Sequence, residues 1–210
     1  MRPSKRFFLL ISLLGLAALI SCAPKEIKPS AIPVYQGGIG RYLTSLNSRY
    51  NMLKAYMSLN VKKSNGTALY GNALANLDPD ETQVRFYQLG IEIGDLQSLM
   101  GKKKEQYAVY ERAIRDGLVW WDLDQYRVTE NSDEITVSSD GRAVVFQPGT
   151  LVPLRQRIKL PKGFLIITYA DYRQTGDLWY PFSVHVEYGG NTMDMQIKQV
   201  EVSFRSVQDQ

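Results

Sequence analysis

Residues 39 to 62, IGRYLTSLNSRYNMLKAYMSLNVK, contain the change of pattern that decides the fold. Between Ile39 and Leu53 the apolar side chains fall at positions i, i+3, i+4, i+7, i+11 and i+14, which predicts one amphipathic helix. From Ala55 to Lys62 apolar residues instead occupy every second position, which predicts a β-strand with one buried face. The polar face of the helix is not strongly basic, so packing on a sheet is favoured over lying on a membrane.

The period of two continues along most of the chain after residue 62. Turn residues such as Ser64-Asn65-Gly66 and Gly189-Gly190-Asn191 separate the strand-like segments. Many short strands joined by tight turns predict an α+β fold with a large, curved antiparallel sheet. The N-terminal helix is expected to cover its concave side, unless the sheet curls on itself. Further strands are expected at residues 67–77, 81–89, 105–115, 126–130, 134–138, 142–147, 163–172, 181–188 and 192–204.

Residues 1–21 are typical of an export signal. A short basic start is followed by an apolar run from Phe7 to Ile20, which is too short to span a bilayer. Ser21 then precedes Cys22, the single cysteine of the chain. These residues resemble the lipobox of bacterial lipoproteins. The resemblance implies that Cys22 is acylated with diacylglycerol and becomes the new N-terminus. The alternative is an ordinary secretory signal that a cysteine happens to follow.

Residues 22–36 contain three prolines and are predicted to be an extended tether, which leaves residues 37–210 as one domain. Ala23 stands where an Asp retains many lipoproteins at the inner membrane, so the lipoprotein resemblance favours the outer membrane. The chain has 25 basic and 21 acidic residues, and removal of the leader takes away three of the basic ones. The remaining near-neutral charge argues against a nucleic-acid partner.

Three segments resemble the LolA/LolB-like family of periplasmic lipoprotein carriers and receptors. They are ITYADYR at residues 167–173, GDLWYPF at residues 176–182 and VRFYQLG at residues 84–90, and the likeness extends over residues 37–204. It implies a half-barrel sheet closed by helices around an apolar cavity for acyl chains. The implied function is that of an outer-membrane-anchored lipoprotein that binds acyl chains or lipoproteins and helps deliver them. The alternative is a non-catalytic envelope assembly lipoprotein with a filled interior.

The inner side chains of the helix and of the first and third strands are the expected lining of such a cavity. They are Leu43, Leu46, Met57, Leu59, Val61, Val84 and Phe86. Trp120 and Trp121 follow Asp116-Gly117-Leu118-Val119 and have two interpretations. They form a wedge for the membrane interface, where tryptophan is enriched, or they belong to a lid helix packed into the core or cavity. The second interpretation is favoured.

The residues that enzymes use are scarce. His185 is the only histidine, and alternation places it on a solvated strand face with Ser183 and Glu187. Without a further cysteine, zinc sites and Cys–His or Ser–His pairs are disfavoured. The acidic residues around Pro79 are expected to form a solvated turn rather than a metal site. We therefore expect no enzyme, no metal and no cofactor beyond the lipid on Cys22, in a protein that is a monomer with a lipid or lipoprotein client.

Overall fold

The computed structural model describes residues 32–95, 98 and 104–205. The expected leader, Cys22 and the tether before Ile32 lie outside these residues. No helix within the described ranges is long and apolar enough to cross a membrane. The elements are α2 (Ile39–Arg49), β1 (Tyr50–Lys62), β2 (Ala68–Leu77), β3 (Thr82–Gln88), β4 (Ile91–Asp95), α4 (Lys104–Leu118), β5 (Arg127–Glu130), β6 (Ile135–Ser139), β7 (Arg142–Phe146), β8 (Pro153–Leu160), β9 (Gly163–Thr175), β10 (Leu178–Tyr188) and β11 (Asn191–Phe204).

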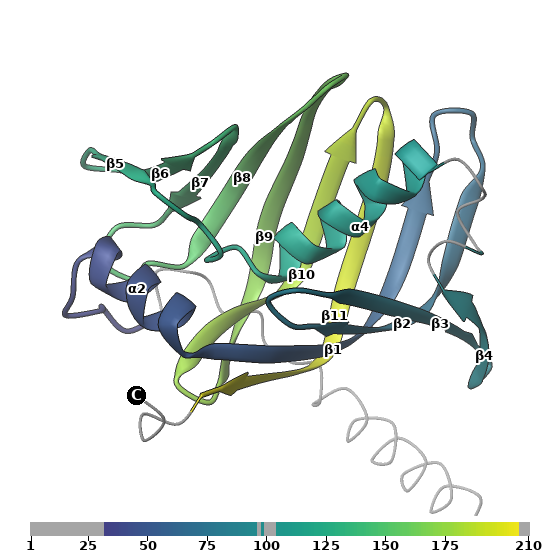
Figure 1. Cartoon of the computed structure of the whole chain (residues 1–210), viewed down its shortest axis with the longest axis horizontal. Helices are drawn as coiled ribbons and strands as arrows, with labels where there is room; N and C mark the ends of the chain where they lie inside the picture. Colours follow the sequence, from purple (N-terminus) through teal and green to yellow (C-terminus); the bar gives the residue numbers. More distant parts are fainter. Residues whose placement is uncertain (1–31, 96–97, 99–103, 206–210) are drawn as a thin grey trace, which may run out of the picture.

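All of these strands belong to one antiparallel sheet, in the order β4-β3-β2-β1-β11-β10-β9-β8-β7-β6-β5. The first and last strands of the chain therefore pair at the centre, and β4 and β5 are the two edges. Figure 1 shows that the long strands bend, so that the sheet curves around α4 and stays open. The large open antiparallel sheet confirms the main part of the predicted fold class.

The helix α2 ends at Arg49, earlier than the apolar spacing predicted. The reason is an irregularity in the next strand, where the pairing of β1 with β11 shifts register between Tyr50 and Met52. Because of this bulge, Tyr50 and Leu53 both face the buried side although they are three residues apart. The Tyr50 hydroxyl donates to the Leu77 carbonyl at 2.8 Å, which fixes the start of β1 against β2.

The strand predicted at residues 105–115 is wrong, because these residues lie within helix α4. Counted from the half-buried Tyr110, the buried Ala113, Ile114 and Leu118 stand at i+3, i+4 and i+8, which is a helical spacing. Two strands were not predicted. One is β4. The other is β8, where the polar Gln156 lies on the inner face and interrupts the expected alternation of apolar and polar residues.

The expectation that the N-terminal helix covers the concave side is not confirmed. In Figure 1, α2 lies at one end of the sheet beside the start of β1, whereas α4 crosses the inner face. The helix α4 contacts β3, β9 and β10. Since α2 runs into β1 without a connecting loop, it extends from the end of that strand and does not turn back over the sheet.

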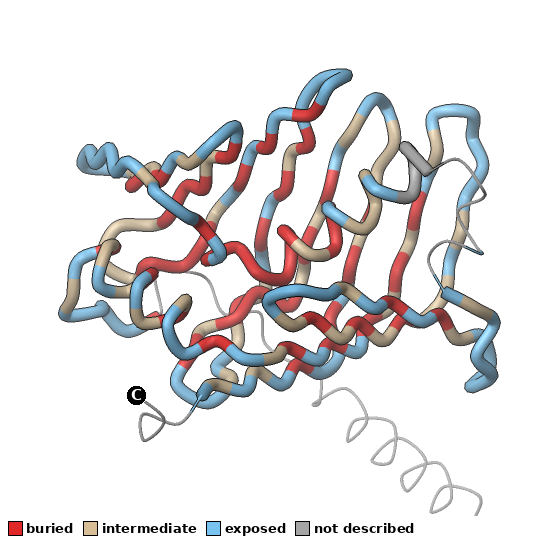
Figure 2. Tube along the Cα trace, in the orientation of Figure 1, coloured by how far each residue is buried: buried red, intermediate tan, exposed pale blue. Residues whose placement is uncertain are grey.

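The core lies between the inner face of the sheet and α4. Figure 2 shows buried and exposed residues alternating along the long strands, as a sheet with one covered face requires. Some residues before position 37, which the sequence assigned to the tether, also join the core. Ile32 is 4% exposed, and the Tyr35 backbone N–H donates to the Gly149 carbonyl at 2.7 Å.

Candidate functional site

The helix α4 packs closely on the inner face of the sheet near its C-terminal end. Gly117 makes this approach possible, because a Cβ there would lie 3.0 Å from Met195 Cε and 3.4 Å from Val184 Cγ1. Ala113 and Ile114, one turn earlier, are also buried. Gly117, with no side chain, therefore allows the helix backbone to lie against Val184 and Met195 of β10 and β11.

A buried polar cluster fixes this end of the helix. The Arg142 guanidinium, on β7, donates to the carbonyls of Asp122 at 2.7 Å and Val119 at 3.0 Å, and to Gln156 Oε1 at 2.7 Å. Gln156 Nε2 in turn donates to the Asp116 carbonyl at 2.6 Å. These bonds satisfy carbonyl groups that the end of a helix leaves without partners.

A second arginine ties α4 to the turn between β2 and β3. Arg115 donates to the carbonyls of Asp78 at 3.0 Å and Pro79 at 2.7 Å, and to Thr82 Oγ1 at 3.1 Å. The Asp78 carboxylate accepts the backbone N–H of Glu81 at 2.7 Å, so its role here is that of a turn residue. Among the described residues, no group of acidic, histidine or cysteine side chains is arranged to hold a metal ion.

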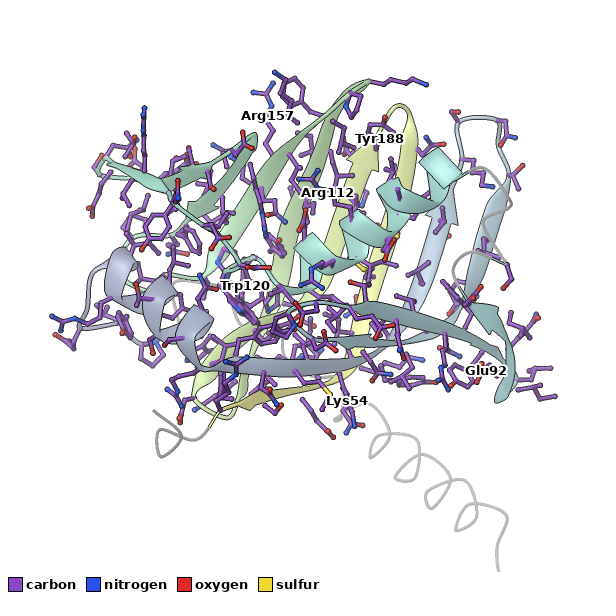
Figure 3. The ribbon with its side chains drawn as sticks, in the orientation of Figure 1. Lys54, Glu92, Arg112, Trp120, Arg157 and Tyr188 are labelled. Atoms are coloured by element: carbon purple, nitrogen blue, oxygen red, sulfur yellow. The ribbon has the colours of Figure 1, made fainter. Side chains whose placement is uncertain are left out.

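Trp120 and Trp121 are fully buried directly after α4. Their rings meet edge to face with centroids 4.6 Å apart, and Trp120 also lies 4.9 Å from the ring of Tyr180. Figure 3 places Trp120 in the interior beside the end of α4. The structure therefore agrees with the core interpretation, and neither indole is exposed as the wedge interpretation requires. Neither indole N–H has an acceptor among the described residues.

The tyrosines around the indoles are neutral and hydrogen-bonded. The Tyr180 hydroxyl donates to the Leu118 carbonyl at 2.7 Å, and the Tyr169 hydroxyl accepts from Gln156 Nε2 at 2.9 Å. Burial raises the pKa of both hydroxyls well above the usual value for tyrosine. They therefore act as fixed hydrogen-bonding groups in a dry interior and do not ionise near neutral pH.

All of the predicted lining residues are buried in one apolar cluster. Leu43 and Leu46 reach it from α2, and the others come from the inner faces of β1 and β3 and from the segment after α4. The members are Leu43, Leu46, Met57, Leu59, Val61, Val84, Phe86, Trp120 and Trp121. The structure thus brings them together, and Cys22 lies outside the described residues.

An uncovered apolar strip extends this inner face at the β4 edge, and the sequence analysis did not identify it. It consists of Leu89, Ile91 and Ile93, which are 96%, 69% and 43% exposed. Glu92 pairs with Tyr87 and lies 3.8 Å from Arg85 on the outer face, so its neighbour Ile91, which pairs with Gln88, faces the inner side. The pairing shifts register between Phe86 and Tyr87, so Ile93 lies at an irregularity next to Gly94, the partner of Phe86. Leu89 adopts a positive φ of 52° at the tip of the hairpin. The alternation of Leu89, Ile91 and Ile93 was the available signal for this strip.

Two hollows formed by described residues lie on the outer side of the sheet and have mixed linings. One of about 370 Å³ lies over β1, β2 and β3 between Lys54, Leu74 and Gln83. A second of about 520 Å³ lies over β5 to β9. On the same outer face, His185 lies 2.6 Å from Asp194 and 3.2 Å from Glu187, as alternation predicted for a solvated position.

No protein-family model matches the sequence, and no curated protein does either. A DUF1329 family protein from Desulfovibrio piger ATCC 29098 has a similar structure, with a TM-score of 0.50 at 9% identity over 77% of this chain and 89% of that one. A domain described as belonging to an outer membrane lipoprotein-sorting protein from Vibrio parahaemolyticus gives a TM-score of 0.44 at 13% identity, covering 78% of this chain and 90% of that one. A LolA superfamily protein from Nitrosomonas europaea gives 0.44 at 8% identity, covering 82% and 96%. At 9% identity, the match to the Desulfovibrio piger protein shows a similar fold alone.

Proposed function

We propose that this protein is a lipoprotein of the outer membrane that binds the acyl chains of a lipid or lipoprotein client and helps deliver the client to that membrane. In this proposal Cys22 carries the lipid anchor, the domain faces the periplasm as a monomer, and no catalytic step, metal or further cofactor takes part. The apolar strip of Leu89, Ile91 and Ile93 is the observation that carries the proposal.

The strip supports acyl binding because its exposed apolar side chains lie next to the buried apolar core of the sheet. Phe86 pairs with Gly94 in the neighbouring strand and is 2% exposed, whereas Ile91, on the same side of β4 as Gly94, is 69% exposed. Contiguous exposed apolar residues cost free energy in water and mark a surface that binds an apolar partner. Each methylene of an acyl chain that is buried there contributes about 0.8 kcal/mol.

The filled interior around the tryptophans favours the second candidate, a non-catalytic envelope protein that uses the same fold to bind proteins. Trp120, Trp121 and Tyr180 occupy the space beside α4 that a carrier would need for several acyl chains. In this alternative the strip contacts a protein partner, and no acyl ligand enters the sheet.

Binding of a fluorescent fatty acid to the full chain tests the acyl site. Replacing Leu89 and Ile91 with Ser should weaken this binding, because it removes apolar contact at the uncovered edge. Val128→Ser is the matched control, since Val128 is 42% exposed on the opposite edge strand and should leave binding unchanged. Equal binding by all three proteins would contradict the proposed position of the acyl chains.

Depletion of the protein from cells distinguishes the two candidates. If it delivers lipoproteins, its loss should leave client lipoproteins outside the outer-membrane fraction. If fatty acids do not bind and clients still reach the outer membrane, the interaction protein is the better description. The anchor has its own test, because Cys22→Ser should yield an unprocessed or soluble protein. A Cys22→Ser protein that is cut and fractionates normally would overturn the lipoprotein assignment.

A further inference from the structure

A basic hollow lies on the outer face of the sheet, on the side away from α4 and the apolar strip. It has a volume of about 520 Å³ and is formed by β5, β6, β7, β8 and the start of β9. Figure 3 shows Arg157 at the upper part of β8, where it is exposed between the buried Gln156 and Ile158 and so faces the outer side. The residues that carry the argument below are Arg127, Ser138, Asp140, Arg157, Lys159 and Phe164.

Three cations line the basic hollow without an acidic partner. Arg127, Arg157 and Lys159 are exposed, and none of them makes an ion pair within the described part of the chain. Arg155 shows the contrast, since it lies on the same face of β8 but outside the hollow and contacts Glu134 at 2.8 Å. Arg142 also lines the hollow but pairs with Asp116, and Asp140 is the one carboxylate in the lining, so the three unpaired cations leave an excess of two positive charges.

The guanidinium of Arg157 is held in a fixed orientation. It lies 3.5 Å from the centroid of the Phe164 ring, a cation–π contact across β8 and β9. Stacking uses the face of the guanidinium and leaves its N–H groups, at the edge, available to an acceptor. The exposed Ser138 lies in the same lining and adds a hydroxyl donor.

We propose that the basic hollow binds a phosphate ester. The stacked Arg157, together with Arg127 and Lys159, offers unused donors that match the several acceptor oxygens and the charge of a phosphate group. The hollow is larger than a phosphate group, so it has room for a glycerol or a sugar attached to the phosphate. The site goes beyond the proposed acyl function and does not depend on it, because it lies on the opposite face of the sheet.

Calorimetric titration of the full chain in a maltoside detergent with glycerol 3-phosphate tests the site. The Arg157→Gln/Lys159→Gln double variant should bind about ten-fold more weakly or not at all, because charge-assisted hydrogen bonds are lost. Arg155→Gln is the matched control and should bind within about two-fold of the original protein, as expected for a paired charge outside the hollow. Phe164→Leu should weaken binding although it keeps every charge. This variant therefore distinguishes the effect of the fixed orientation of Arg157 from non-specific electrostatic attraction.

A second experiment distinguishes between a lipid headgroup and a soluble phosphate ester as the ligand. The full chain is placed in phosphatidylcholine vesicles that contain either phosphatidylglycerol or, at equal surface charge, oleate. Stronger competition with glycerol 3-phosphate by phosphatidylglycerol than by oleate identifies a lipid headgroup as the ligand. Equal competition identifies a soluble phosphate ester. The proposal is overturned if glycerol 3-phosphate does not bind, or if Arg155→Gln weakens binding as much as the double variant does.

Discussion

Arg142 and Asp116 form a buried ion pair, with 3.4 Å between the Arg142 Nη1 and Asp116 Oδ1 atoms. The pair joins β7 to the last turn of α4, and the same guanidinium also bonds to two carbonyls beyond the helix. The buried charge of Arg142 is tolerated because the Nε, Nη1 and Nη2 atoms of its guanidinium all have partners in the interior. The contact therefore fixes where α4 ends and where the two tryptophans begin.

Arg142→Gln should destabilise the domain by about 3–5 kcal/mol, the usual result of removing one member of a buried pair. Asp116 would keep only its contact with Arg112, and the carbonyls of Val119 and Asp122 would lose their donor. Urea unfolding followed by tryptophan fluorescence measures the change. Arg155→Gln is the control, because an exposed pair contributes about 0–1 kcal/mol. Similar losses for both variants would show that Arg142 does not hold the helix.

Gly117 tests how closely α4 must approach the sheet. Gly117→Ala should change the free energy of unfolding by less than about 1 kcal/mol, because alanine favours the helix and the nearest atom is the flexible end of Met195. Gly117→Val should be destabilising by about 1–3 kcal/mol, since its methyl groups meet Val184 and Ile167 as well. Thermal unfolding of both variants measures the difference, and a neutral valine would mean that the helix is not in close contact.

The strands could be predicted largely because their pattern is local. In β10, for example, alternation gave the correct faces of Val184 and His185 before any partner strand was known. The helices were harder, because a bulge at Tyr50 imitates helical spacing and α4 contains residues of high strand propensity such as Val109 and Tyr110. Which helix covers the sheet depends on long-range packing, and no local pattern specifies it.

The residues of the candidate sites also differ in whether a local sequence pattern or the tertiary structure determines their environment. Met57 and Phe86 were correctly predicted to face inward, since alternation alone determines that property. Ile91 has the same apolar character, and the edge position of β4 leaves it uncovered, whereas Leu89 is exposed at the tip of the hairpin. The basic hollow depends on Arg127 coming beside β8 residues through three intervening strand pairings, which the sequence does not reveal.

Leu46 provides a test of the buried face of α2. It is 7% exposed, so Leu46→Asp would bury a charge that has no partner. We expect a loss of at least about 3 kcal/mol in the free energy of unfolding, measured in urea. Thr44→Asp is the control, because Thr44 is exposed on the same helix and the change should cost little. If the melting temperature of Leu46→Asp is unchanged, α2 is available to a membrane or a partner.

His185 should make the stability of the sheet depend on pH near neutrality. Its pKa is raised, chiefly by the hydrogen bond to Asp194, and the nearby Glu187 acts in the same direction. A raised pKa means that the folded state binds the proton more tightly, so the stabilisation is complete below the ordinary histidine pKa of about 6.5 and is lost as pH rises through the folded value. The urea midpoint should therefore fall between pH 5.5 and pH 8 in the original protein, and fall less in His185→Gln. Asp194→Asn should reduce the same pH dependence, whereas an unchanged slope in both variants would assign the effect to other groups.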